Sequence, residues 1–143
     1  MSEIRSIKTG FWVLWSLVLA FGAQALAMEA PPVDRDQLTC VGFVSYVDGS
    51  YEKLTLDVAS YDKDFLDAKT EEISFLVDMY YLPKQAVNLM IYDLRNAAYT
   101  TVVAGFRPIA GSKKIYEARL TYKPPQDPLI EQAQLVCVVD MDL

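Results

Sequence analysis

Apolar and polar side chains alternate along most of the chain after Cys40. Between positions 53 and 58, for example, Leu54, Leu56 and Val58 alternate with a lysine, a threonine and an aspartate. A period of two is typical of antiparallel strands that bury one face and expose the other. The pattern predicts about seven strands, near positions 38–47, 51–59, 72–81, 86–94, 98–106, 114–122 and 133–142.

The segments between these strands favour short connections. Asp-Gly-Ser at 48–50 is typical of a tight hairpin turn, because aspartate and glycine adopt the backbone geometry that the turn requires. Proline and glycine interrupt 107–113 and 123–128, where strands are expected to end. Residues 61–72 lack alternation and carry apolar side chains close to helical spacing. We therefore expect one short helix or ordered loop near 61–71.

The pattern favours an all-β fold, an antiparallel β-sandwich of about seven strands. The alternative is a small up-and-down β-barrel. The long connection at 61–72 would interrupt an up-and-down order, which favours the sandwich. Both tryptophans lie in the first 15 residues, so the Cys-Trp-Cys signature of immunoglobulin domains is missing from the predicted strands.

The first 27 residues have the three parts of a secretory signal peptide. Arg5 and Lys8 precede the apolar stretch FWVLWSLVLAFG, and Ala-Leu-Ala at 25–27 supplies the small residues that a signal peptidase requires. The alternative is an uncleaved membrane anchor, because the uncharged run at 9–28 reaches a membrane-spanning length. The weakly apolar second half of that run favours cleavage.

Cleavage after Ala27 leaves a polar leader at 28–37 and a single β domain at 38–143. The exported protein is then expected in the periplasm or outside the cell, with no stable membrane insertion. Loss of residues 1–27 reduces 13 basic and 19 acidic residues to 11 and 18, a net charge of −7. A surface of this sign repels nucleic acid, which is therefore not an expected partner.

Histidine is absent from the whole chain. Its absence removes the commonest general base, the histidine-centred triads and the usual ligands of zinc and copper. The sequence also has no glycine-rich phosphate loop and no nucleophilic-serine motif, and nothing in it fixes two carboxylates at the separation of a glycosidase. We expect neither enzyme activity nor a cofactor.

The chain has two cysteines, Cys40 in the first predicted strand and Cys137 in the last. In an exported protein without metal-ligating histidines, such a pair predicts a disulfide. A redox-active or nucleophilic thiol would need an activating histidine or a Cys-X-X-Cys spacing, and the sequence has neither. We expect a buried structural bridge that holds the terminal strands together.

Acidic residues are concentrated between positions 57 and 78, at Asp57, Asp62, Asp64, Asp67, Glu71, Glu72 and Asp78. The spacing of Asp62, Asp64 and Asp67 partly resembles a calcium-binding loop, but the glycine and the distal glutamate of an EF-hand are missing. A solvated loop is the alternative. We do not predict metal ligands, and calcium binding by this segment stays open.

Basic residues gather later in the chain, at Arg107, Lys113, Lys114, Arg119 and Lys123. An acidic and a basic segment on one small domain allow copies to dock head to tail, which would produce a homo-oligomer. The same two segments could instead be neighbours that neutralise each other within one molecule. The sequence leaves both readings open.

Nine tyrosines follow the predicted signal peptide. Tyrosine is frequent in strands and also at binding surfaces, where it offers apolar area and a hydroxyl group together. Tyr80, Tyr92 and Tyr99 fall on the more polar side of their predicted strands. They are the candidate binding residues.

Together these features predict a small exported β-sandwich with one disulfide that acts as a non-catalytic protein-binding module. Its expected partner is another envelope or secreted protein. One alternative is a structural or assembly subunit that forms oligomers through its charges or an exposed edge strand. A second alternative is a calcium- or carbohydrate-binding module.

Overall fold

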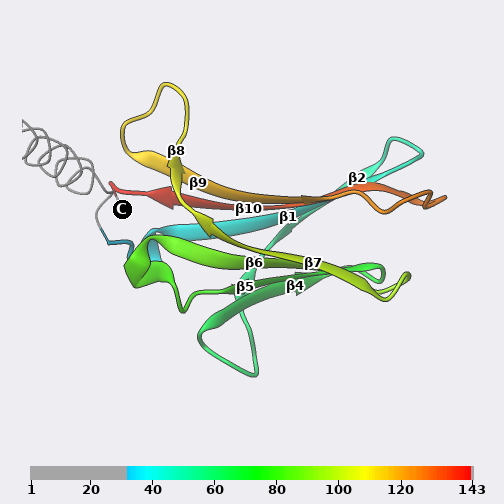
Figure 1. The fold of residues 1–143 in the computed structure, drawn as a ribbon, viewed down its shortest axis with the longest axis horizontal. Helices are drawn as coiled ribbons and strands as arrows, with labels where there is room; N and C mark the ends of the chain where they lie inside the picture. The colour runs from blue at the N-terminus through cyan, green and yellow to red at the C-terminus, as the bar shows by residue number, and fades with distance from the viewer. Residues whose placement is uncertain (1–31, 143) are drawn as a thin grey trace, which may run out of the picture. The chain divides into compact units, whose positions relative to one another are not determined.

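The computed structural model of the chain describes residues 32–142. These residues form two antiparallel β-sheets of five strands each, stacked as a β-sandwich (Figure 1). Sheet A contains, in spatial order, β2 (Tyr51–Thr55), β1 (Leu38–Tyr46), β10 (Ile130–Asp140), β9 (Ile115–Tyr122) and β8 (Arg107–Pro108). Sheet B contains β3 (Asp57–Val58), β4 (Phe65–Lys69), β5 (Ile73–Asp78), β6 (Ala86–Asp93) and β7 (Ala98–Gly105).

The chain passes between the two sheets at both sides of the sandwich. Leu56 separates β2 from β3, and Phe106 separates β7 from β8. Strands that change sheets at such a bend form the corners of a sandwich. Within each sheet the strands pair in sequence order, and β10 pairs with β1. The strand order is therefore up-and-down, while the architecture is the predicted sandwich and not a closed barrel.

The core lies between the sheets and comes from alternate residues of the central strands. Its largest fully buried side chains are Phe75, Ile73, Leu89, Ile91, Ile130, Leu135, Val44, Val77, Val87 and Val139. Gly42 of β1 allows the sheets to approach, because a Cβ atom at this position would lie 2.4 Å from the Phe75 ring. The ring occupies the space that a side chain at position 42 would need.

All seven predicted strands are present, but the expected helix or loop near 61–71 is wrong in part. Residues 65–69 form β4, which pairs with β5 and β3. Leu66 points into the core, while Phe65 lies on the outward side and contacts Tyr61 with ring centroids 6.2 Å apart. Because the outward Phe65 and the buried Leu66 are both apolar and adjacent, the sequence does not show the period of two that is typical of a strand.

Cys40 and Cys137 form a buried disulfide, as predicted. They lie directly opposite each other in the β1–β10 pair, with their Cα atoms 4.0 Å apart. The backbone N–H of Leu56 donates to the carbonyl of Cys40. The backbone groups of Cys40 therefore point toward β2, and the disulfide joins a non-hydrogen-bonded pair of β1 and β10. A disulfide indicates folding in an oxidising compartment outside the cytoplasm.

The predicted signal peptide at 1–27 lies outside the described residues, as does the start of the leader. The rest of the leader is packed against the domain. Val33 is buried, residues Arg35–Gln37 form a 3-10 turn, and Arg35 pairs with Asp64. Among residues 32–142, no helix has the length and apolar character needed to cross a membrane.

Candidate functional site

The outward side of sheet B carries a group of aromatic and apolar side chains. The register of β4, β5, β6 and β7 aligns the outward residues in rows across the sheet. We call the group the aromatic face; its members are Tyr61, Phe65, Leu76, Met90, Tyr92 and Tyr99. Tyr61 and Tyr99 are 64% and 66% exposed, which is high for such large side chains. Contiguous exposed aromatic residues are typical of binding surfaces.

Tyr92 and Tyr99 are directly opposite each other on β6 and β7. Their rings stack with centroids 5.7 Å apart and an interplanar angle of 28°. Cross-strand aromatic pairs of this kind stabilise a sheet and hold each other's rotamers in place. The pair is therefore an ordered aromatic surface and not two independent side chains.

A hollow of about 330 Å³ lies on the same face. Ser74 and Leu76 of β5 line it together with Tyr61 and Tyr92. Since Ser74 lies opposite Tyr92 in the register, the tyrosine stands beside the floor of the hollow. The hollow is large enough to hold one large side chain or one sugar ring, and its lining offers both apolar area and hydroxyl groups.

Two charged groups of β4, Asp67 and Lys69, also line the hollow. Burial, followed by the charges of Asp67 and Asp62, raises the pKa of the Tyr61 hydroxyl. Tyr61 therefore stays protonated at neutral pH and can donate a hydrogen bond. The lining supplies donors, acceptors and ring faces, which is the chemistry of recognition.

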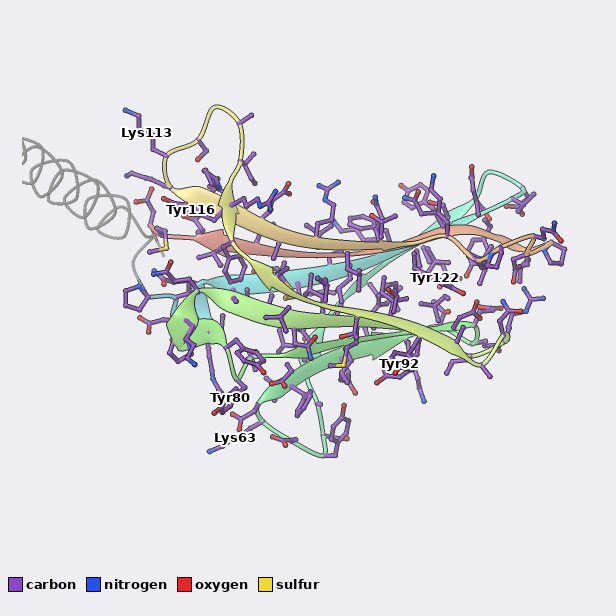
Figure 2. All side chains as sticks on the ribbon, viewed as in Figure 1. Lys63, Tyr80, Tyr92, Lys113, Tyr116 and Tyr122 are labelled. Carbon is purple, nitrogen blue, oxygen red and sulfur yellow. A yellow bond between two sulfur atoms is a disulfide. The ribbon has the colours of Figure 1, made fainter. Side chains whose placement is uncertain are left out.

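The three predicted tyrosines do not form one site. Tyr92 and Tyr99 lie together, whereas Tyr80 lies toward the other end of sheet B (Figure 2). Tyr80 is 73% exposed and contacts Tyr81 edge-to-face at 5.2 Å. Sequence reasoning missed Tyr61, which lies in an irregular segment and follows no strand pattern. It also missed Leu76, although alternation with the buried Phe75 placed Leu76 on the outward side.

β7 forms one edge of sheet B and, among residues 32–142, pairs only with β6. Phe106 N–H donates to the Gln85 carbonyl at 3.1 Å, continuing the β6–β7 register. Hydrogen bonding alternates along an antiparallel strand, so the backbone groups of even-numbered residues face β6. Those of the odd-numbered residues face the free edge, namely Tyr99, Thr101, Val103 and Gly105.

The other edges are short or charged. Tyr46 N–H donates to the Ser50 carbonyl, so the backbone groups of even-numbered β2 residues bond to β1. The backbone groups of Tyr51, Lys53 and Thr55 therefore face the free edge. β3 and β8 are two residues long, and β8 consists of an arginine and a proline. Lysine, proline and short length are the usual means of protecting a sheet edge from pairing. β7 is eight residues long and has none of these features.

A second hollow, of about 520 Å³, opens beside β7. Its lining includes Val102, Ala104 and Phe106 from the β7 side and Ala118 from β9. β8 is too short to cover the remainder of β9, so the two sheets are open to solvent along this side. This explains why Val102, on the inward side of its strand, is still 38% exposed.

The acidic and basic segments lie at opposite sides of the sandwich. The acidic residues lie on β3, β4, β5 and the loops between them, and the basic ones lie on β8, β9, the loop between them and the residue after β9. The loops that carry Lys63 and Lys113 project in opposite directions (Figure 2). The two segments are therefore not neighbours that neutralise each other within one molecule.

The three candidate calcium ligands have separate contacts. Asp64 pairs with Arg35, and Asp62 accepts a hydrogen bond from the backbone of Asp64. Asp67 lies on β4, beside the hollow of the aromatic face. Among residues 32–142, no three cysteine, aspartate or glutamate side chains converge in a way that would hold a metal ion.

Asp93, which is 1% exposed, connects the two sheets. Its carboxylate accepts hydrogen bonds from Tyr122 of β9 (Figure 2) at 2.9 Å and from the Asn96 side chain at 2.7 Å. Burial would raise the pKa of Asp93, but the hydrogen bonds from Asn96 and Tyr122 outweigh burial and lower it. Its four hydrogen bonds come from three residues, Arg95, Asn96 and Tyr122, which hold a turn and the other sheet in place, so we assign this buried carboxylate to stability.

No protein-family model matches the chain, and the comparisons with curated proteins and with solved structures found no match either.

Proposed function

We propose that the protein is a non-catalytic binding module of the cell envelope or the extracellular space, and that the aromatic face is its binding surface. The observation that carries the proposal is the ordered Tyr92–Tyr99 pair beside the hollow lined by Tyr61 and Leu76. Export through a signal peptide is part of the proposal, and the disulfide supports it.

The expected ligand is a segment of another exported protein that inserts one aromatic or aliphatic side chain into the hollow. Ring faces from Tyr61 and Tyr92 would cover that side chain, and Leu76 would lie beneath it. Asp67 and Lys69 at the same hollow would bind the polar groups that flank it. A central apolar anchor with a polar surround is the usual composition of a protein-binding hot spot.

Site-specific photo-cross-linking tests this function. A photoreactive phenylalanine analogue replaces Tyr61 in one variant and Tyr80 in a matched control, since both tyrosines are exposed and only Tyr61 belongs to the aromatic face. Irradiation in envelope and culture fractions is expected to yield a discrete adduct at position 61 that Y92A suppresses. The same adducts at both positions, or none at either, would reject the aromatic face as the binding surface.

A carbohydrate is the second candidate ligand, because the hollow combines tyrosine rings with the Asp67 carboxylate. Sugars stack their apolar faces on aromatic rings and donate hydroxyl hydrogen bonds to carboxylates. Calorimetric titration with purified envelope saccharides separates the two candidates. Binding that is lost in both Y92A and D67N would replace the protein ligand with a carbohydrate, and the absence of heat would leave the protein ligand as the proposal.

A further inference from the structure

The free edge of β7 is long, uncharged and exposed. No charged residue lies between Arg95 and Arg107, and Tyr99 and Val103 are 66% and 53% exposed. An edge of this kind readily accepts another strand, because its unpaired N–H and C=O groups are already aligned. Thr101 lies between Tyr99 and Val103 on the outward side of β7, and none of the outward residues of this strand is a lysine or a proline.

We infer that β7 pairs with β7 of a second copy of this chain, antiparallel, about a two-fold axis at Val102. In this register Tyr99 lies opposite the second copy's Gly105, and Thr101 lies opposite the second copy's Val103. These residues are the ones whose backbone groups face the free edge. Each of these four residues forms a hydrogen-bonded pair with a residue of the second copy, and two bonds per pair give on the order of eight new backbone hydrogen bonds.

The side chains in this register are complementary in size. A Cβ atom built on Gly105 would meet only the Gln85 carbonyl oxygen, at 4.0 Å, so the space above the glycine is open. Gly105 therefore leaves room for the second copy's Tyr99, whose ring stays stacked on its own Tyr92. Inward, Thr100 lies opposite the second copy's Ala104, and the two Val102 side chains meet on the axis. Each pair across the axis avoids placing two large residues together, which is the condition for close strand packing.

The symmetry of the pair has a consequence for the aromatic face. Two antiparallel strands of one sheet are related by an axis perpendicular to that sheet, so both outward sides point in the same direction. The two sheets B would join into one sheet of ten strands with two aromatic faces side by side. This inference goes beyond the proposed function and does not depend on it, since association is measured without any ligand.

Charge distinguishes this dimer from head-to-tail docking. The whole chain has a net charge of −6, so two copies repel each other, while β7 itself has no charged side chain; Arg107, Glu117 and Arg119 line the hollow beside it. Added salt screens this repulsion, and the β7 pair is expected to form equally well or more tightly at high salt. Docking of the acidic segment on the basic segment of another copy would weaken with salt.

A single cysteine on the axis tests the register. Val102 and its symmetry mate form a non-hydrogen-bonded pair with Cα atoms about 4.5 Å apart, the same type of pair that Cys40 and Cys137 occupy. Under mild oxidation, V102C is expected to form a disulfide-linked dimer in non-reducing electrophoresis. T101C is the control, because its neighbour across the axis is the second copy's Val103. Cross-linking by T101C as efficiently as by V102C, or no cross-linking by V102C, would overturn the register.

Sedimentation of the mature protein tests the dimer itself, at low and high salt. The wild type is expected to dimerise at both. V103P removes one N–H that faces the free edge and keeps the β6–β7 hydrogen bonds, so it should remain folded by circular dichroism and associate at least about tenfold more weakly. A monomeric wild type at all concentrations, a dimer lost at high salt, or a folded V103P that dimerises normally would each overturn the inference.

Discussion

The two sheets of this protein are held differently. Sheet A has a disulfide between its central strands, and its long outer strand, β2, carries Lys53 at the middle of the free edge. Sheet B has no covalent link among the described residues, and the free edge of β7 is uncharged over eight residues. The edge strands β2 and β8 of sheet A are thus charged or short, whereas sheet B keeps both an exposed aromatic face and a long uncharged edge strand.

The difference separates stability from interaction. In sheet A, the disulfide links β1 to β10, and Lys53 places a charge at the β2 edge, which favours stability without further strand pairing. In sheet B, apolar and aromatic side chains of the outward side and of the free edge stay exposed, which points to contacts with other molecules. Variants in sheet A should therefore change the free energy of unfolding, and variants at β7 should change association.

The largest expected effect is that of removing the disulfide. The double variant C40A/C137A releases a cross-link that spans 97 positions of the chain. The chain-entropy model predicts a loss of roughly 4 to 5 kcal/mol in the free energy of unfolding. Urea denaturation measures this loss. The dimerisation of the folded variant is expected to stay unchanged, because β7 lies in the other sheet.

An unfolding free energy equal to that of the wild type would show that the bridge is dispensable. Loss of dimerisation in a fully folded double variant would contradict the division of roles between the sheets.

The next effect concerns the contact between the sheets. Y122F removes the hydroxyl that donates to the buried carboxylate of Asp93, at an expected cost of about 2 kcal/mol. The native pKa of Asp93 lies below its ordinary value of 3.8. A lowered native pKa means that the ionised group stabilises the fold above pH 3.8 and that this contribution disappears as the pH falls through the native pKa.

In Y122F one cause of the lowered pKa is absent, so acid unfolding should begin at a higher pH than in the wild type. Thermal unfolding across the acid range measures the shift, with Y116F as a control on the same strand. Identical acid profiles for Y122F and the wild type would remove Asp93 from the account of acid stability.

The smallest effect tests the charge on the edge of sheet A. K53V removes the charge from the three β2 residues whose backbone groups face the free edge, Tyr51, Lys53 and Thr55, and leaves Glu52 of the same strand in place. The variant is expected to form species larger than a dimer in sedimentation, because a β-branched cross-strand pair at the new edge contributes up to about 1 kcal/mol. K63V, at an exposed loop position, is the matched control. A K53V protein that behaves as the wild type would show that the lysine does not protect this edge.

Local pattern was sufficient for much of the fold. Alternation located the seven long strands, and the two cysteines identified the bridge. β4 was missed because Phe65 is aromatic on the outward side, so two apolar residues stand together where the pattern requires one. The segment is a strand because it pairs with β3 and β5, and its local sequence does not contain that information.

The candidate site was predicted only in part for a similar reason. Tyr92 and Tyr99 were assigned to the outward side correctly, but the register between β6 and β7 is what stacks them. Tyr80 was expected on the strand at 72–81, but β5 ends at Asp78, so Tyr80 lies in the turn that follows and not beside the stacked pair. The uncharged run from Tyr99 to Gly105 is visible in the sequence. Its meaning depends on β7 being an edge strand, and strand order is a property of the whole fold.

Amide hydrogen exchange along β7, followed residue by residue by NMR at increasing protein concentration, tests the open edge most directly. At low concentration the amides of Thr100, Val102 and Ala104 are expected to be protected by β6, while those of Thr101 and Val103 exchange rapidly. At high concentration Thr101 and Val103 should become protected as the second copy pairs with them. Equal protection of odd and even positions at low concentration would contradict the free edge, and odd positions that stay unprotected at every concentration would contradict the pairing of β7.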